Sequence, residues 1–435
     1  MSFCPSLRPV TTRALYLAGC TALGLSLSGA APADDTPSLT LEAAVSEALA
    51  GNPGLAEIHA RSDAMAAVPS QAGALPDPTL RFEAQNLPTD SFDLRDEDMT
   101  LLQVGVSQEL PFPGKLALKE KAAEYEAAAA RDSIEEARLR LVRDVKVLWW
   151  QIHFRERALE VLAANEVKLR QLAEVAQARY EVGEGAQQDV LLARLEQSKL
   201  REMELGHIRQ HHSEIARLNA LLDRPGDTPL RLAAPDEAAL PEVPSASTLR
   251  DLAEHNRPAL AKKRKAVDAA KTRVELAEKD YLPDFTVDAG YAARQDTPAG
   301  ARRSDFASVG VSMNLPLYAA DKQGKAVDQR QSELLQEQYA LQDALRKVQA
   351  DVAATLAGFH SAREEVALYQ NDILPQAKQT VDAMLAGYRV GKVDFLDLIR
   401  AQIAVLEYET RYWQAFVHVR QALAKLAFAA GKEGL

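Results

Sequence analysis

One long stretch, residues 113–181, constrains the fold of this chain more than any other feature. No proline or glycine occurs between Lys115 and Glu181, so nothing in the local sequence interrupts a helix there. At about 1.5 Å per residue, an unbroken helix over this stretch would be about 100 Å long. A chain of this size cannot wrap a core around such a helix, so it must lie against other long helices.

Apolar residues recur along this helix at alternate steps of three and four residues. Eleven of the fourteen positions in this seam are apolar, a pattern that is typical of a coiled coil. A solvated single helix would not keep this register. The seam consists of Ile134, Arg138, Leu141, Val145, Leu148, Ile152, Arg155, Leu159, Leu162, Glu166, Leu169, Ala173, Ala176 and Tyr180.

Residues 1–33 have the features of a secretory signal peptide. Two arginines precede a weakly polar run, and Ala31-Pro32-Ala33 offers a small-residue cleavage site. A competing interpretation comes from Leu17-Ala18-Gly19-Cys20, which resembles a bacterial lipobox and would make Cys20 the lipidated first residue. We favour cleavage near Ala33, because the apolar run continues past Cys20.

Charge and cysteine content narrow the classes of function. The chain carries 51 basic and 62 acidic residues, and its only cysteines, Cys4 and Cys20, fall in the predicted leader. A mature protein without cysteine fits export and excludes disulfide bonds and thiolate-bound metals. Its acidic balance argues against nucleic acid as a partner and is compatible with the passage of cations.

The chain contains one unit written twice. Val104-Gly105-Val106-Ser107 recurs as Val309-Gly310-Val311-Ser312 at an offset of 205 residues, and Leu75-Pro76-Asp77 recurs as Leu282-Pro283-Asp284 at an offset of 207. Tyr180, Val182, Gly183 and Asp189 recur as Tyr388, Val390, Gly391 and Asp397 at an offset of 208. Three motifs kept in order at nearly one offset indicate an internal duplication.

Both halves are predicted to have the same order of elements. The first, residues 34–223, has a helix broken at Asn52-Pro53, strands near 79–88 and 100–110, the long helix 113–181 and a returning helix 187–222. The second, residues 248–435, has a helix broken at Arg257-Pro258, strands near 284–293 and 306–315, a long helix 320–389 and a returning helix 395–430. Pro375 should bend the second long helix or open it locally.

The segment between the two halves, residues 224–247, holds five prolines and few periodic apolar residues. This composition predicts a linker that runs over the surface.

The four predicted strands alternate between apolar and polar residues. Such segments, about ten residues long, are the signature of an outer-membrane β-barrel, and a soluble sheet packed on helices is the alternative. The apolar side comprises Leu80, Phe82, Ala84, Leu102, Val104, Val106, Phe285, Val287, Ala289, Tyr291, Ala293, Val309, Val311, Met313 and Leu315. The polar side comprises Arg81, Glu83, Gln103, Ser107, Thr286, Asp288, Ser308 and Ser312.

Four strands cannot close a barrel, and an open sheet edge in lipid would leave backbone groups unpaired. Several copies must therefore contribute strands to one barrel. Two, three or four copies would give 8, 12 or 16 strands, and the sequence pattern alone does not choose among them.

No catalytic motif is present in the sequence. It has no glycine-rich phosphate loop, no His-Glu-x-x-His and no Gly-x-Ser-x-Gly. His207 and His211, with His212 beside them, share a face of the first returning helix at a spacing that can ligate zinc. Because no third ligand is clustered with them, we expect no metal site. Because no catalytic motif is present, we also expect no cofactor and no enzymatic activity.

The two-fold repeat, the paired strands and the Tyr-x-Val-Gly turns resemble the TolC-like outer-membrane efflux family over essentially the whole mature chain. Leu75-Pro76-Asp77-Pro78, Asn86-Leu87-Pro88 and Pro111-Phe112-Pro113-Gly114-Lys115 are most similar to its heavy-metal resistance branch, of the cobalt-zinc-cadmium and copper-silver type. The resemblance implies a mainly α fold with a small membrane β-barrel portion. It further implies a homotrimer whose 12-stranded barrel in the outer membrane continues into a long periplasmic α-helical barrel.

The resemblance also implies two sites at the periplasmic tip. Family members meet their adaptor at the Val-Gly turns, which here are Val182, Gly183, Val390 and Gly391. In the family, acidic residues line the closed tip and bonds from tyrosine and arginine hold it shut, and Asp189, Asp397, Tyr180 and Tyr388 match the acidic and tyrosine positions. Alternatively, Asp189 and Asp397 are only helix-start residues favoured by the helix dipole.

The chain departs from the family at two gate positions. Val393 stands where some relatives have a gating arginine, and Arg400 stands where some have a second aspartate. Asp394 and Arg389 are the candidates to compensate for these changes.

The resemblance implies a passive conduit, driven by an inner-membrane pump of the RND type through a periplasmic adaptor. Efflux of heavy-metal cations is the leading function, and the same duct serving multidrug efflux or type I protein secretion is the alternative. A periplasmic coiled-coil tether without a pore is a hypothesis of a different class. The implied partners are two further copies of the chain, the adaptor, the pump and outer-membrane lipid.

Overall fold

The structure is a computed structural model that describes residues 38–235 and 240–435, and residues 38–435 form one unit. The predicted cleavage near Ala33 and the alternative lipidation of Cys20 lie outside the described residues.

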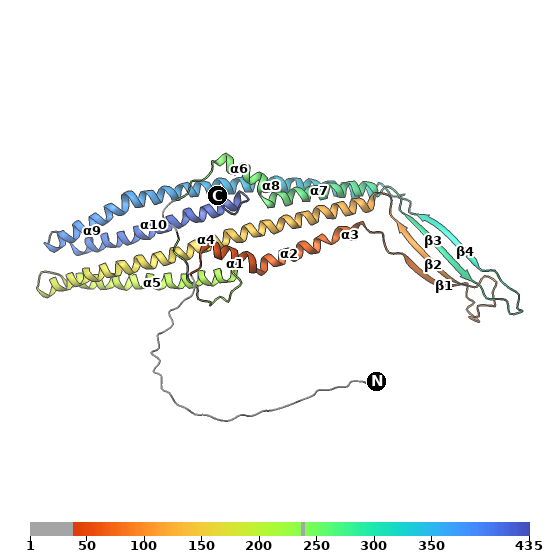
Figure 1. The fold of residues 1–435 in the computed structure, drawn as a ribbon, viewed down its shortest axis with the longest axis horizontal. Coiled ribbons are helices and arrows are strands. Elements are labelled where there is room, and N and C mark those ends of the chain that lie inside the picture. Colours follow the sequence, from red (N-terminus) through yellow and green to blue (C-terminus); the bar gives the residue numbers. More distant parts are fainter. Residues whose placement is uncertain (1–37, 236–239) are drawn as a thin grey trace, which may run out of the picture. The chain divides into compact units, whose positions relative to one another are not determined.

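Each half contributes long helices and one pair of strands (Figure 1). The first half comprises α1 (Leu41–Gly51), α2 (Pro53–Ala66), α3 (Val68–Gly73), β1 (Thr79–Gln85), β2 (Leu101–Leu110), α4 (Lys115–Glu181) and α5 (Gln187–Leu221). The second comprises α6 (Ala246–Asn256), α7 (Pro258–Lys279), β3 (Phe285–Ala293), β4 (Phe306–Met313), α8 (Gln323–Leu368), η1 (Tyr369–Ile373), α9 (Leu374–Arg389) and α10 (Phe395–Ala429). Figure 1 shows the strands at one end of this unit and the α4–α5 and α9–α10 turns at the other.

Proline and its capping residues divide the first helical segment. The side-chain oxygen of Asn52 accepts a hydrogen bond from the Leu55 backbone N–H at 3.0 Å, and Pro53 begins α2, as the sequence predicts. A second break at Ala67, shortly before Pro69, separates α2 from α3. We did not predict this break.

The long helix α4 runs beside a different set of helices in each half of its length. It contacts α2, α3 and α7 toward the sheet, and α5 and α10 toward the turns. These contacts bury two separate clusters of residues. The first cluster includes Trp149, Ile152, Phe359 and Leu426, and the second includes Leu169, Phe395, Leu398 and Ile399. The predicted coiled-coil seam therefore lies at real helix–helix contacts.

The second long helix is interrupted by the π-helix η1, which ends two residues before Pro375. The Leu374 backbone N–H bonds to the Tyr369 carbonyl, five residues back, so the helix gains one extra residue at this point. The extra residue explains a change in the repeat offset. Buried Val145 and Ile152 correspond to buried Val352 and Phe359 at an offset of 207, whereas residues after the π-helix correspond at 208.

The linker between the halves is not confined to the surface, contrary to the prediction. Leu232 is buried in the main core and pairs with Leu39 through a parallel bridge, and the Leu39 backbone N–H bonds to the Arg231 carbonyl at 2.8 Å. Leu230, Leu240 and Val243 also pack against this core. These scattered apolar residues lack a helical or strand period, which is why the pattern concealed their burial.

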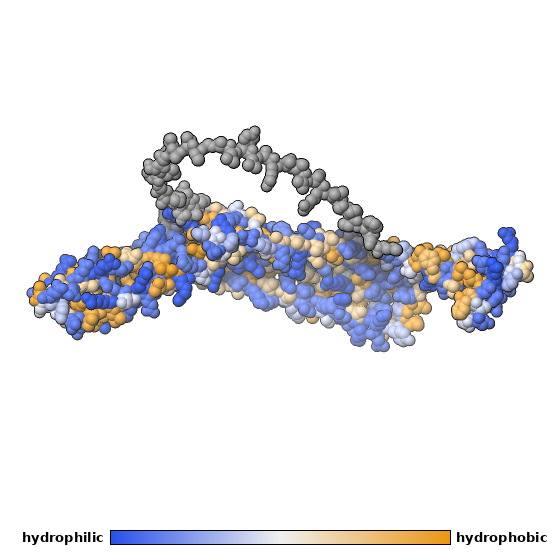
Figure 2. Space-filling model, turned by 90° about the horizontal axis from the view of Figure 1, so that it is seen from below, coloured by the Kyte–Doolittle hydropathy of each residue, from blue (hydrophilic) through white to orange (hydrophobic). Residues whose placement is uncertain are grey.

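The four strands form one antiparallel sheet in the order β1-β2-β3-β4. Val104 pairs with Phe82 on one side and Tyr291 on the other, and Val287 pairs with Val311, so the apolar residues share one face. Many of them are exposed, and Figure 2 shows hydrophobic surface at the strand end. The edges of the sheet, β1 and β4, are each paired on one side only.

Two glycines with the same backbone conformation should respond differently to alanine. Gly183 and Gly431 both have positive φ, at 79° and 71°. A Cβ on Gly183 would meet no atom within 4 Å, so Gly183→Ala should cost only the left-handed strain of about 1–2 kcal/mol. A Cβ on Gly431 would lie 2.6 Å from the backbone of Asn256, so Gly431→Ala should lower the thermal unfolding midpoint clearly more. Equal midpoints for the two purified variants would contradict this account.

Candidate functional site at the helical tip

The two turns at the helical tip have the same backbone motif. In the first, the Glu184 N–H bonds to the Arg179 carbonyl at 2.8 Å and the Gly183 N–H bonds to the Tyr180 carbonyl at 3.0 Å. In the second, Lys392 and Gly391 make the matching bonds to Gly387 and Tyr388 at 2.9 and 3.0 Å. These are Schellman motifs, and they require the positive φ of 79° and 72° at Gly183 and Gly391.

A valine precedes each of these glycines and points into solvent. Val182 is 71% exposed and Val390 is 68% exposed. The two turns therefore hold both apolar side chains outside the core.

Arg179, near the end of α4, joins the two turns. One guanidinium nitrogen donates to the Tyr388 carbonyl, and the other donates to the Glu184 carbonyl at 3.3 Å. The guanidinium carbon lies 4.9 Å from the centre of the Tyr388 ring, within the range of a cation–π contact. One residue of the first repeat thus holds the turn of the second.

Asp189 and Tyr388 face each other beside Arg179. Tyr388 is 4% exposed, and its ring packs against Phe395 with centroids 5.2 Å apart. Burial raises the pKa of Tyr388, and the nearby Asp189 carboxylate raises it further. Burial also raises the pKa of Asp189, and the charge of Asp394 adds to this, while the Tyr388 hydroxyl and Arg179 oppose it. The cluster thus links α5, from the first repeat, to α9 and the start of α10.

The other predicted gate residues lie apart from this cluster. Tyr180 and Arg389 are exposed. Asp397 is also exposed, and its nearest cation is Arg400 on the same helix, at 3.7 Å. The structure therefore brings Asp189, Tyr388 and Asp394 together and leaves Tyr180, Arg389 and Asp397 at the surface of a single copy.

Arg179 is the one member of this cluster that sequence reasoning missed, although comparing the repeats could have found it. Its counterpart is Gly387, and the counterpart of Val393 is Gly185. A Cβ on Gly387 would lie 2.6 Å from Val393 Cγ2, and a Cβ on Gly185 would lie 3.0 Å from Arg179 Cβ. In the first turn the large residue, Arg179, precedes its glycine, Gly185. In the second turn the glycine, Gly387, precedes the large residue, Val393.

The histidines of α5 do not make a metal centre. Glu156 on α4 lies between His211 of α5, whose Nε2 is 3.5 Å from one carboxylate oxygen, and His153 of α4, whose Nδ1 is 3.9 Å from the other. Burial lowers the pKa of His207, and the charge of Arg155 lowers it further. Among residues 38–235 and 240–435, no three His, Cys, Asp or Glu side chains are arranged to hold a metal ion.

The chain belongs to the outer membrane efflux protein family, whose model matches residues 44–223 and, separately, residues 249–432. The predicted family resemblance is thereby confirmed. The protein is an outer-membrane channel of the passive, TolC-like class and not an enzyme. In the described part of the chain, no helix combines the length and apolar character needed to cross a membrane.

Two curated relatives resemble this chain over most of its length. It is 24% identical to the cobalt-zinc-cadmium resistance protein CzcC of Cupriavidus metallidurans, over 94% of each chain. It is 25% identical to the outer membrane efflux protein BepC of Brucella suis, over 72% of this chain and 67% of BepC.

Solved structures of outer-membrane channels confirm the predicted fold class. The channel OprN superposes with a TM-score of 0.78 at 16% identity, over 90% of this chain and 89% of OprN. CusC superposes with a TM-score of 0.77 at 17% identity, over 90% of this chain and 92% of CusC.

Proposed function

We propose that this chain is the outer-membrane exit duct for heavy-metal cations in a three-part efflux complex. The observation that carries the choice of cargo is the match to CzcC, which is named for cobalt-zinc-cadmium resistance and covers 94% of both chains. The match to the alkaline protease secretion protein AprF of Pseudomonas aeruginosa covers only 63% of this chain and 57% of AprF. A metal duct therefore accounts for more of the sequence than a secretion duct does.

The sheet supports a trimeric duct. Its four strands expose an apolar face suited to lipid, and its other face carries Arg81, Gln103, Ser107, Asp288 and Ser312, which suit a water-filled lumen. Three copies would close 12 strands into a barrel, continuous with a barrel of helices that crosses the periplasm.

The cluster at the tip supports a gate. In the closed state, Arg179 holds the turn of the second repeat, and Asp189 faces Tyr388. A periplasmic adaptor that docks on Val182, Gly183, Val390 and Gly391 would favour the open state if it binds that state more tightly. Asp394 and Asp397 add negative charge at the tip, which suits the passage of cations.

Growth of a deletion strain tests the cargo. The strain should be sensitive to some of zinc, cadmium, cobalt, nickel, copper and silver, and the restored gene should correct this. The same strain should grow normally on a panel of dyes and antibiotics. A strain restored with an assembly-defective variant controls for expression. Sensitivity to drugs alone, or loss of protease secretion with normal metal tolerance, would leave the duct standing and overturn the metal cargo.

A further inference from the structure

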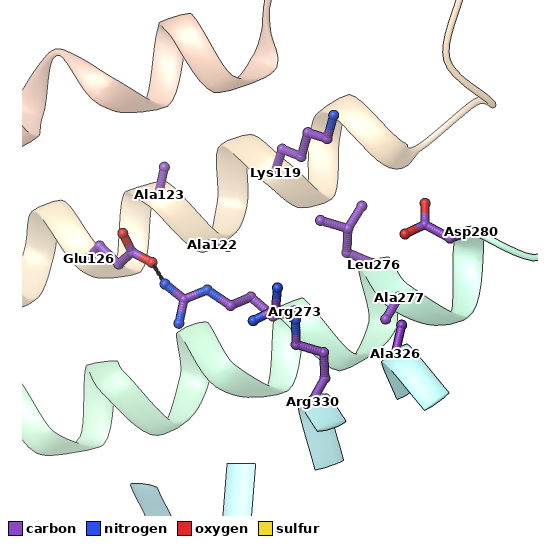
Figure 3. A pocket seen from close by; sticks show the side chains of 10 residues that line it. All are labelled: Lys119, Ala122, Ala123, Glu126, Arg273, Leu276, Ala277, Asp280, Ala326 and Arg330. Carbon is purple, nitrogen blue, oxygen red and sulfur yellow. Dashed lines mark hydrogen bonds and ion pairs between the residues drawn. The ribbon is translucent and has the colours of Figure 1, made fainter. Parts of the chain in front are cut away.

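The two repeats of one chain already show how one unit docks on the next. Strand β2 of the first repeat pairs with β3 of the second, and α4 packs along α7. Two ion pairs cross this contact. Arg273 on α7 bonds to Glu126 on α4 (Figure 3), and the Arg257 guanidinium holds Glu136 with two bonds of 2.9 and 3.0 Å.

A buried lysine joins the repeats where helix passes into strand. Lys115, the first residue of α4, is 4% exposed. Its ammonium lies 2.9 Å from one oxygen of Asp284 and 3.2 Å from one of Asp280, and it donates to the Leu282 carbonyl at 3.1 Å. Because Asp284 immediately precedes β3, this contact ties the start of one long helix to the start of the other repeat's strand.

The counterparts of Lys115 and Asp284 lie at the free edges of the chain, which are the sides of the edge strands β4 and β1 that no other strand covers. Before the π-helix, the long helices correspond at an offset of 207, so Lys322 is the counterpart of Lys115, and Asp77 is the counterpart of Asp284. Lys322 and Asp77 are exposed, and among the described residues neither makes an ion pair. Lys322 immediately precedes α8, in the segment that follows β4, and Asp77 lies two residues before β1.

The returning helices also carry corresponding residues that are buried on one helix and exposed on the other. Ile399 on α10 is 1% exposed and Ile403 is partly buried, both packed in the core near the tip. Their counterparts on α5, Leu191 and Leu195, are 56% and 53% exposed. The face that α10 buries against its own chain is therefore apolar and uncovered on α5.

We propose that a second copy of the chain docks on these free edges in the arrangement in which the second repeat docks on the first, with Lys322 of one copy paired to Asp77 of the next. This inference rests on the proposed trimeric duct and specifies its contacts. Charge complementarity at the two ends and the apolar face of α5 both favour another copy over any other occupant.

The repeat also specifies the register of the strands between copies. Val104 pairs with Tyr291 within the chain, so the offsets of 205 and 207 place Val309 opposite Ala84 of the next copy. Likewise Ser107 pairs with Asp288, which places Ser312 opposite Arg81. Apolar residues then meet apolar ones, whereas a shift by one residue would reverse the faces.

The first arm of the test is disulfide trapping in the full chain, in outer-membrane fractions. Directly opposed Cβ atoms in an antiparallel pair are about 5 Å apart, and diagonal ones are about 7–8 Å apart. The pair Ser312→Cys with Arg81→Cys should therefore give a covalent trimer on oxidation, and the pair Ser312→Cys with Glu83→Cys should give far less. Chains with one of these cysteines control for other cross-links. Equal or stronger trapping of the second pair would overturn the register.

The second arm is a charge exchange. Lys322→Glu should lower the temperature at which the trimer dissociates, and Lys322→Glu combined with Asp77→Lys should restore it. Lys325→Glu is the matched control, because Lys325 bonds to Asp328 on its own helix at 2.9 Å. Failure of the double variant to restore the trimer, with the wild-type trimer intact, would overturn the ion pair alone. Absence of a trimer from the wild-type chain would overturn the proposed duct and this docking together.

Discussion

Replacing Val309 by arginine should abolish assembly of the channel in the outer membrane. Val309 lies in the middle of β4, on the apolar face of the sheet, and is 82% exposed. An arginine facing lipid near the middle of the bilayer costs about 2–4 kcal/mol, and every copy in the assembly would carry one. Heat-resistant oligomers in outer-membrane fractions, measured by gel electrophoresis without boiling, should disappear.

The neighbouring residue provides the matched control. Ser308 lies on the opposite face of the same strand, where it pairs with Gly290, so Ser308→Arg should place its charge in the water-filled lumen. We expect this variant to assemble and to change ion selectivity instead. Equal loss of the oligomer in both variants would mean that the apolar face does not contact lipid.

The sheet could be predicted from the sequence because a period of two is a local property that each strand carries by itself. The duplication strengthened this prediction of the sheet, because the same alternation occurs in both repeats, in Val104-Gly105-Val106-Ser107 and in Val309-Gly310-Val311-Ser312. The long helices could also be predicted, because apolar residues at steps of three and four are likewise a local property of each helix. The extra residue in η1 was visible only as an offset that changed by one.

The contacts of the tip could not be predicted from the sequence in the same way. Whether Arg179 reaches Tyr388 depends on how two helical hairpins from different repeats pack side by side, and no period or motif records that. The family resemblance supplied Asp189 and Tyr388, whereas Arg389, the candidate to compensate for a departure from the family, is exposed in the structure. The burial of Leu232 in the linker escaped notice because an isolated apolar residue has no period.

Replacing Arg179 by alanine should open the tip of the assembled channel. The variant loses the hydrogen bonds to the Tyr388 and Glu184 carbonyls and the cation–π contact. A charged hydrogen bond and a cation–π contact together contribute about 2 kcal/mol in the closed state, which corresponds to about a 30-fold shift toward open channels. Conductance in planar bilayers should therefore rise well above that of the wild type.

Two further variants separate this latch from general changes at the tip. Arg389→Ala removes an arginine from the end of α9 that is exposed and makes no ion pair in the part of the chain that the structure describes, so its conductance should stay near that of the wild type. Tyr388→Phe keeps the ring beneath Arg179 and removes only the hydroxyl that faces Asp189, so it should open the tip less than Arg179→Ala. If Arg389→Ala leaked as much as Arg179→Ala, closure would depend on the net positive charge at the tip, and the bond from Arg179 to the second turn would not be the latch.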